Sequence, residues 1–265
     1  MFKTNIFDKT GDHEIVRRGG IFSVLEYARD ISVSPDMASE AFFASQMNVR
    51  KKQLLAELNY DRGVITQAGA MQMMVGDLKA ATNIKGAGDL VKKFVGSKVT
   101  RESTIKPHYT GSGILALEPT FKYIILENLS DWDNSLVIED GMFLACEDTV
   151  DLKVTARSTI SSAVLGKEGL FNTELRGSGF VALESSVPQD ELMVIEIEDD
   201  VVKIDGDMAI AWSSSLSFTV ERTTATLIGS MAAGEGLVNV YRGTGKVLVA
   251  PVADNRGITV PQTKP

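Results

Sequence analysis

GSGILALEP, beginning at Gly111, has two counterparts further along the chain: GSGFVALES from Gly177 and GTGKVLVAP from Gly243. The first glycines lie at equal intervals, since 177 − 111 = 66 and 243 − 177 = 66. Each glycine pair precedes a short run rich in apolar residues, which is typical of a buried strand. An equal interval repeated twice indicates a fold built from copies of one unit. The sequence therefore predicts an all-β protein made of about three copies of a β-meander.

The glycine pairs themselves are predicted to be structural turns: Gly111 and Gly113, Gly177 and Gly179, Gly243 and Gly245. A phosphate-binding glycine loop leads into a helix, whereas here each pair leads into a strand, and no GxxxxGK[ST] string occurs. We expect the first glycine of each pair to adopt a backbone conformation that larger residues disfavour.

Composition is that of an ordinary globular protein. The chain has 265 residues, of which 44% are hydrophobic, and a net charge of −8, which disfavours nucleic-acid binding. No apolar stretch reaches the roughly 18 residues of a transmembrane span, and the N-terminus lacks the order of a signal peptide. The single cysteine, Cys146, lies in the apolar run MFLAC and suits a core thiol in a reducing compartment. We expect a cytoplasmic protein.

Two short helices are predicted among the strands. Ser34 and Pro35 form a helix start that leads into a helix over Met37–Met47. The second helix is predicted over Gly88–Lys98, where four apolar residues share one face that either packs on the sheet or forms an interaction face: Leu90, Val91, Phe94 and Val95. The domain boundaries follow as an N-terminal extension packed on the core (1–50), a β domain (51–253) and a loose tail (254–265).

Several of these pieces resemble the AIM24 family. They are the string Gln67-Ala68-Gly69-Ala70-Met71, the segment from Gly86-Ala87-Gly88 to Val91-Lys92-Lys93, and the three Gly-x-Gly strands. The resemblance covers about residues 50–251 and implies a double-stranded β-helix or β-sandwich with internal pseudo-threefold repeats, near the tryptophan RNA-binding attenuation protein in fold space. Mitochondrial members are associated with inner-membrane organisation. The family offers no catalytic residues to carry over.

Candidate catalytic and metal-binding residues are few. The histidines, His13 and His108, lie far apart, and neither begins the H-x-[DE] string of a two-His, one-carboxylate iron site. The serine clusters at 158–162 and 213–215 lack the G-x-S-x-G context of a nucleophile. Glu118 and Glu184 stand at matching places in the repeats, where an acid–base pair or simple repetition would explain them. We expect no cofactor, no metal and no catalytic residues.

Burial of the repeated strands bears on assembly. Apolar residues occupy both alternating sets of positions in three strands: Ile114–Leu117, Phe180–Leu183 and Val247–Ala250. Both faces of each of these strands should therefore be covered. A homo-oligomer, with a trimer favoured, would supply one covering layer. We expect a non-enzymatic β scaffold that self-assembles and binds a protein or membrane-associated partner. The alternatives are a small-ligand binder or enzyme using the β-helix interior, and RNA binding by fold analogy.

Overall fold

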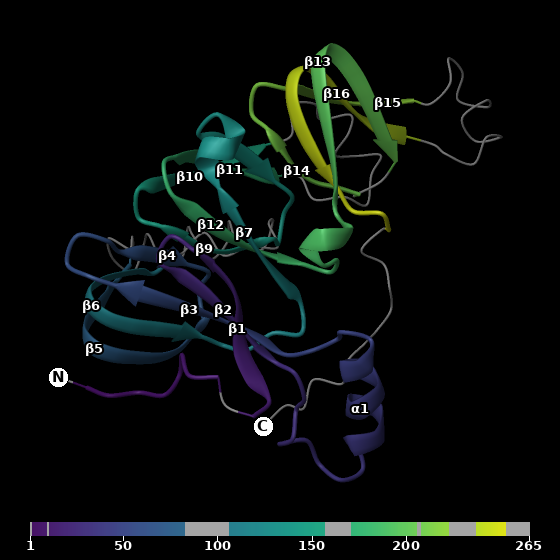
Figure 1. Cartoon of the computed structure of the whole chain (residues 1–265). Helices are drawn as coiled ribbons and strands as arrows, with labels where there is room; N and C mark the ends of the chain where they lie inside the picture. Colours follow the sequence, from purple (N-terminus) through teal and green to yellow (C-terminus); the bar gives the residue numbers. More distant parts are fainter. Residues whose placement is uncertain are drawn as a thin grey trace, which may run out of the picture.

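A computed structural model describes residues 2–9, 11–82, 106–156, 171–205, 208–222 and 237–252 (Figure 1). Over these residues the chain is all-β, with curled antiparallel sheets, one α-helix and two short 3-10 turns, η1 (Leu129–Trp132) and η2 (Gln189–Glu191). The remaining elements, in chain order, are β1 (His13–Gly19), β2 (Phe22–Tyr27), α1 (Ala38–Gln46), β3 (Lys52–Leu58), β4 (Val64–Thr66), β5 (Met71–Ala81), β6 (His108–Leu117), β7 (Tyr123–Asn128), β8 (Ser135–Ile138), β9 (Phe143–Glu147), β10 (Val150–Ala156), β11 (Phe171–Gly177), β12 (Phe180–Ser185), β13 (Met193–Asp205), β14 (Ala209–Ser213), β15 (Ser217–Arg222) and β16 (Leu237–Val249).

Each Gly-x-Gly stretch lies in the middle of a group of antiparallel strands. We call these groups unit 1 (β3 to β6), unit 2 (β7 to β12) and unit 3 (β13 to β16). The central strand is β6 in unit 1, β11 followed by β12 in unit 2, and β16 in unit 3. On one side the central strand pairs with β3 and β4 in unit 1, with β7 and β8 in unit 2, and with β13 in unit 3. On the other side the central strand pairs with β5 in unit 1, with β9 and β10 in unit 2, and with β14 and β15 in unit 3.

The strand register on the β5, β9 and β14 side is the same in the three units. On the β5, β9 and β14 side, an irregularity in the pairing lies between residues 116 and 117, 182 and 183, and 248 and 249 of the central strands, again 66 residues apart. At each place the other strand has an extra residue: Gln72, Leu144 or Ile210. An extra residue in one strand bends it and increases its twist, so each unit curls at the same point.

Consecutive units are joined by strand pairing at two junctions. β4 of unit 1 pairs with β9 of unit 2, and β8 of unit 2 pairs with β14 of unit 3. As a result the sheets run without a break from one unit into the next, and unit 2 lies between the other two (Figure 1).

The hydrophobic core is divided into clusters that correspond to the three units. One cluster fills unit 2 and includes Leu248 of unit 3; a second fills unit 1 and includes Ala182 of unit 2; a third fills unit 3. The central strands therefore pack on their own unit with one face and on the preceding unit with the other. The expectation that both faces are covered is met inside a single chain, and no neighbouring subunit is required for these strands.

The N-terminal segment extends unit 1. β1 pairs with β2, and β2 pairs with β3. Ile6, Phe7 and Ile15 pack on Leu55 and Ala116, the outer face of unit 1, which has no preceding unit. α1 projects away from the sheets at the lower right of Figure 1.

The helix predicted over Met37–Met47 is present as α1, but its N-cap is Met37 and not Ser34, because the backbone N–H of Met37 bonds to the carbonyl of Ser34 at 3.0 Å and closes a turn first. The glycine pairs, predicted as structural turns, are not all loops between strands. Gly111 and Gly113 lie inside β6, and the pair in unit 3 lies inside β16; in unit 2 the chain breaks there into β11 and β12.

Candidate functional site

The glycine pairs mark bends rather than a binding loop. Gly111, Gly177 and Gly243 have φ of +117°, +129° and +120°, a region that other residues rarely adopt, as the sequence analysis requires. At this point β6 changes its partner from β4 to β3, and β16 changes from β15 to β14. Gly113, Gly179 and Gly245 also have positive φ. The pairs thus let the central strand bend at the point where its pairing partners change.

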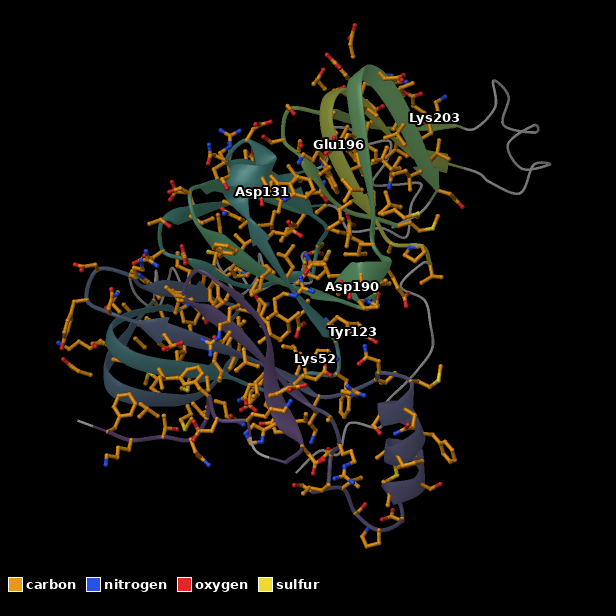
Figure 2. The ribbon with its side chains drawn as sticks, in the orientation of Figure 1. Lys52, Tyr123, Asp131, Asp190, Glu196 and Lys203 are labelled. Carbon is orange, nitrogen blue, oxygen red and sulfur yellow. The ribbon has the colours of Figure 1, made fainter. Side chains whose placement is uncertain are left out.

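A buried cation lies where unit 1 meets the N-terminal segment. The ammonium of Lys52 is 3.5 Å from a carboxylate oxygen of Glu26, and Arg50 bonds to the other oxygen at 2.8 Å. Lys52 also stands 4.3 Å from the ring centroid of Tyr123, and both are labelled in Figure 2. Burial lowers the pKa of Lys52, an effect that Glu26 opposes. These groups satisfy one another, so the cluster is suited to joining units rather than to chemistry.

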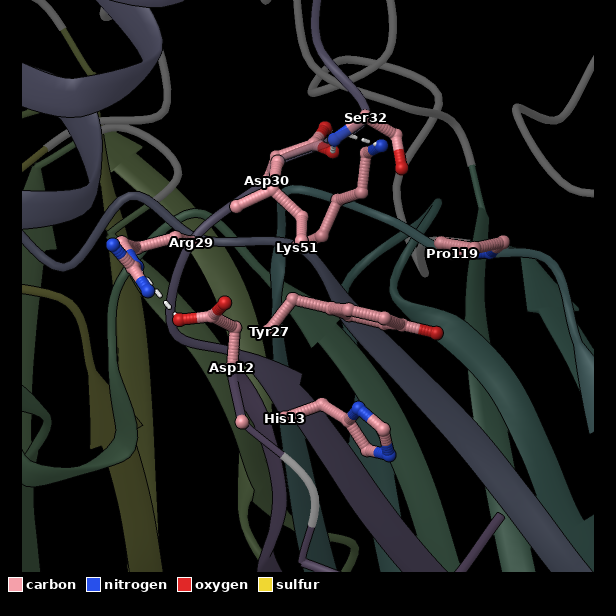
Figure 3. A pocket seen from close by; sticks show the side chains of 10 residues that line it. Asp12, His13, Tyr27, Arg29, Asp30, Ser32, Lys51 and Pro119 are labelled. Atoms are coloured by element: carbon pink, nitrogen blue, oxygen red, sulfur yellow. Dashed lines mark hydrogen bonds and ion pairs between the residues drawn. The ribbon is translucent and has the colours of Figure 1, made fainter. Parts of the chain in front are cut away.

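A cleft of about 550 Å³ opens beside the start of β1 and the end of β2 (Figure 3). Its charged walls are paired: Arg29 with Asp12 at 2.6 Å, and Lys51 with Asp30 at 2.5 Å. His13 and Tyr27, which are paired residues of β1 and β2, both line it, with ring centroids 5.9 Å apart. The sequence gives no signal for this cleft, because its residues come from strand ends and the loops beside them and share no spacing pattern.

The candidate catalytic residues do not come together. His108 lies 3.1 Å from Asp148, and Glu184 pairs with Lys122 at 2.8 Å, while Glu118 is exposed in another unit. Cys146 is fully buried, and burial raises the pKa of its thiol far above the usual range. Among the described residues no three His, Cys, Asp or Glu side chains converge as a metal site would need.

The predicted interaction face of Leu90, Val91, Phe94 and Val95 lies outside the described residues, as do the serine cluster at 158–162 and the predicted tail. Other apolar side chains are exposed instead. On and beside α1 they are Ile31, Phe42, Phe43 and Met47. On the outer strands they are Met71, Met73 and Met74 of β5, and Met193, Val194 and Val201 of β13. Such groups mark interaction surfaces more often than scattered single residues do.

No helix in the described part of the chain is both long and apolar enough to cross a membrane.

The family model for mitochondrial biogenesis AIM24 matches residues 44–252. The chain belongs to the AIM24 family. An uncharacterised protein of Streptococcus pyogenes serotype M6 is 28% identical over 204 residues, which cover 74% of this chain and 80% of that protein. The crystal structure of another Streptococcus pyogenes protein has a TM-score of 0.56 and 25% identity, covering 77% of this chain and 88% of that one.

Proposed function

We propose that this AIM24 protein is a non-enzymatic β scaffold of three repeated units that self-assembles and binds a protein or membrane-associated partner. The single observation that carries the proposal is the repeated register: the pairing irregularity recurs beside residues 117, 183 and 249. Three units that share register are most simply described as internal pseudo-threefold repeats, each a short double-stranded β-helix. Repeat arrays present extended surfaces whose usual role is recognition.

The partner-binding part of the proposal is supported by α1. Phe42 and Phe43 pack edge to face with ring centroids 5.5 Å apart, and both are exposed on a helix whose one buried residue is Ser45. Aromatic anchors of this kind dominate interface energetics. The fully buried cysteine suits a reducing compartment, so the proposal places the scaffold in the cytoplasm.

The test has two parts. Light scattering coupled to size exclusion should give a mass above the 28.7 kDa of one chain at micromolar concentration. Capture from native lysate should retain a partner on the natural chain, lose it on Phe42→Ser/Phe43→Ser, and keep it on Val16→Ser, a control at an exposed residue of β1. A monomer at all concentrations without an α1-dependent partner would contradict the proposal.

A small-ligand binder is the second candidate, favoured by the cleft in Figure 3. A thermal-shift screen of small polar and aromatic molecules, with Tyr27→Ala as the control, checks it. A stabilising ligand whose effect is lost in that variant would support this candidate over the scaffold.

A further inference from the structure

We propose that a second copy of this chain adds to the first by strand pairing between β13 of one copy and β5 of the other, in a defined register. The proposal rests on the self-assembly proposed above and names its surface and its partner. It follows from the two junctions inside the chain, which leave one complementary edge at each end of the molecule.

The two inner junctions use equivalent residues. Three residues of the central strands lie 66 residues apart: Tyr109, Leu175 and Tyr241. They pair with Val64, Leu136 and Val202, respectively. On the other side, residues 116, 182 and 248 pair with Met73, Ala145 and Ala211. These correspondences place Val202–Ile204 of unit 3 where units 1 and 2 have their junction strands β4 and β8. They place Met73–Val75 of unit 1 where the next units have β9 and β14.

The β4–β9 and β8–β14 junctions pair equivalent residues with each other. The pairs in the first are Val64 with Glu147, Ile65 with Cys146, and Thr66 with Ala145. The pairs in the second are Leu136 with Ser213, Val137 with Trp212, and Ile138 with Ala211. The flanking backbone bonds also match: Gln67 N–H to Leu144 O at 2.8 Å, and Glu139 N–H to Ile210 O at 3.0 Å. A third junction of this kind would set Val202 opposite Val75, Lys203 opposite Met74, and Ile204 opposite Met73.

The two edges that would form this third junction are open. In the described part of the chain, no strand pairs with β13 on the side away from β16, nor with β5 on the side away from β6. Met73 and Met74 are 38% and 41% exposed, whereas the residues equivalent to them, Ala145, Cys146, Ala211 and Trp212, are at most 2% exposed. Exposed apolar edges of this length are templates for another strand.

A second copy fits these edges better than the chain itself does. Figure 1 places β5 and β13 at opposite ends of the molecule, with unit 2 between them. Lys203, labelled in Figure 2, lies on β13 in unit 3. Head-to-tail pairing of two different edges is a heterologous contact, which closes into a ring or continues as a filament.

The described part of the N-terminal segment forms no strand pair with β5, although the ring of Phe2 lies beside Gly76. Ile6 and Phe7 cover Leu55 and Ala116, the face that a preceding unit would cover, without pairing with β5. Incoming β13 therefore meets an edge whose backbone is unpaired beside a face that is already capped. This pairing adds main-chain hydrogen bonds and buries the two methionines.

Engineered cysteines test the register. In both inner junctions the residues equivalent to Val75 and Val202 form a non-hydrogen-bonded pair, whose Cα spacing of about 4.5 Å suits a disulfide. Val75→Cys and Val202→Cys are purified separately, mixed, oxidised mildly and run on a non-reducing gel. We expect a two-chain product from the mixture and none from either variant alone, since Cys146 is fully buried.

The matched control is Val201→Cys, one residue out of register, mixed with Val75→Cys. An equal yield with this control, or no cross-link with Val202→Cys in folded protein, overturns the proposal. An internally linked single chain from the double variant Val75→Cys/Val202→Cys also overturns it, because the chain would then close on itself. If light scattering of the natural chain shows an oligomer without this cross-link, self-assembly stands and this interface fails; a monomer refutes both.

Discussion

The inner junctions and the outer edges use equivalent positions of units 1, 2 and 3, matched by their pairing with the central strands, but bury them differently. Where β4 meets β9 and β8 meets β14, the paired residues are mostly apolar and enclosed. The equivalent positions on β5 carry methionines that are exposed. Local pattern therefore determines that a strand forms, while its place in the array decides whether the strand is enclosed. Methionine suits an edge that changes its surroundings, because its side chain is flexible and polarizable.

The largest expected effect compares the enclosed middle unit with the end unit. A Cβ on Gly177 would lie 2.4 Å from the carbonyl oxygen of Thr149, whereas a Cβ on Gly243 meets nothing nearer than 3.7 Å. Both glycines have positive φ, so both alanine variants are strained. We expect Gly177→Ala to lower the free energy of unfolding by about 3 kcal/mol and Gly243→Ala by about 1 kcal/mol. Urea denaturation measures both; equal losses would show that space around the glycine is immaterial.

The glycine interval shows what the sequence could predict. A spacing of 66 residues located the central strand of each unit, because only a glycine tolerates the backbone at these bends. It did not reveal that the pairs of units 1 and 3 lie inside long strands, since a bend within a strand and a turn between strands have the same residue signature. The segment 59–63 has the composition of a hairpin turn, yet it connects β3 and β4, which pair with β6 and not with each other. Strand partners far apart in sequence leave no local signal.

The candidate surfaces were less predictable than the fold. Apolar residues in a helix usually indicate a packed face, yet Phe42 and Phe43 of α1 are exposed. The open edges of β5 and β13 became visible only from the register of the two junctions, a long-range property. Exposure depends on which elements lie nearby, and the spacing of residues along one element does not carry that information.

The next prediction compares two valines at the same position of the unit. Val64 lies in the first inner junction and is fully buried, while Val202 lies on the open edge of β13 and is partly exposed. We expect Val64→Ala to cost about 2 kcal/mol, from lost burial and a residual cavity, and Val202→Ala less than half as much in dilute protein. Denaturation at several protein concentrations measures both. If the cost of Val202→Ala grows with concentration, an assembled form buries this residue.

The smallest expected effect lies at Glu127 of β7, which is hydrogen-bonded to Trp132 of η1. Burial raises the pKa of this carboxyl above its ordinary value of 4.5, although the indole N–H of Trp132 donates a bond to it at 3.0 Å and acts in the opposite direction. The folded chain therefore holds the proton more tightly than the unfolded chain does. The resulting stability is complete below the ordinary pKa and is lost as the pH rises through the raised one.

Glu127→Gln, which keeps an acceptor for Trp132 without a charge, should remove this dependence. Relative to the natural chain, the variant should gain stability between pH 4 and pH 7, by less than about 1 kcal/mol. Thermal unfolding across that range measures the difference, with Glu196→Gln on exposed β13 as the control. A parallel pH profile for the two variants would mean that burial beside Trp132 does not affect the carboxyl of Glu127.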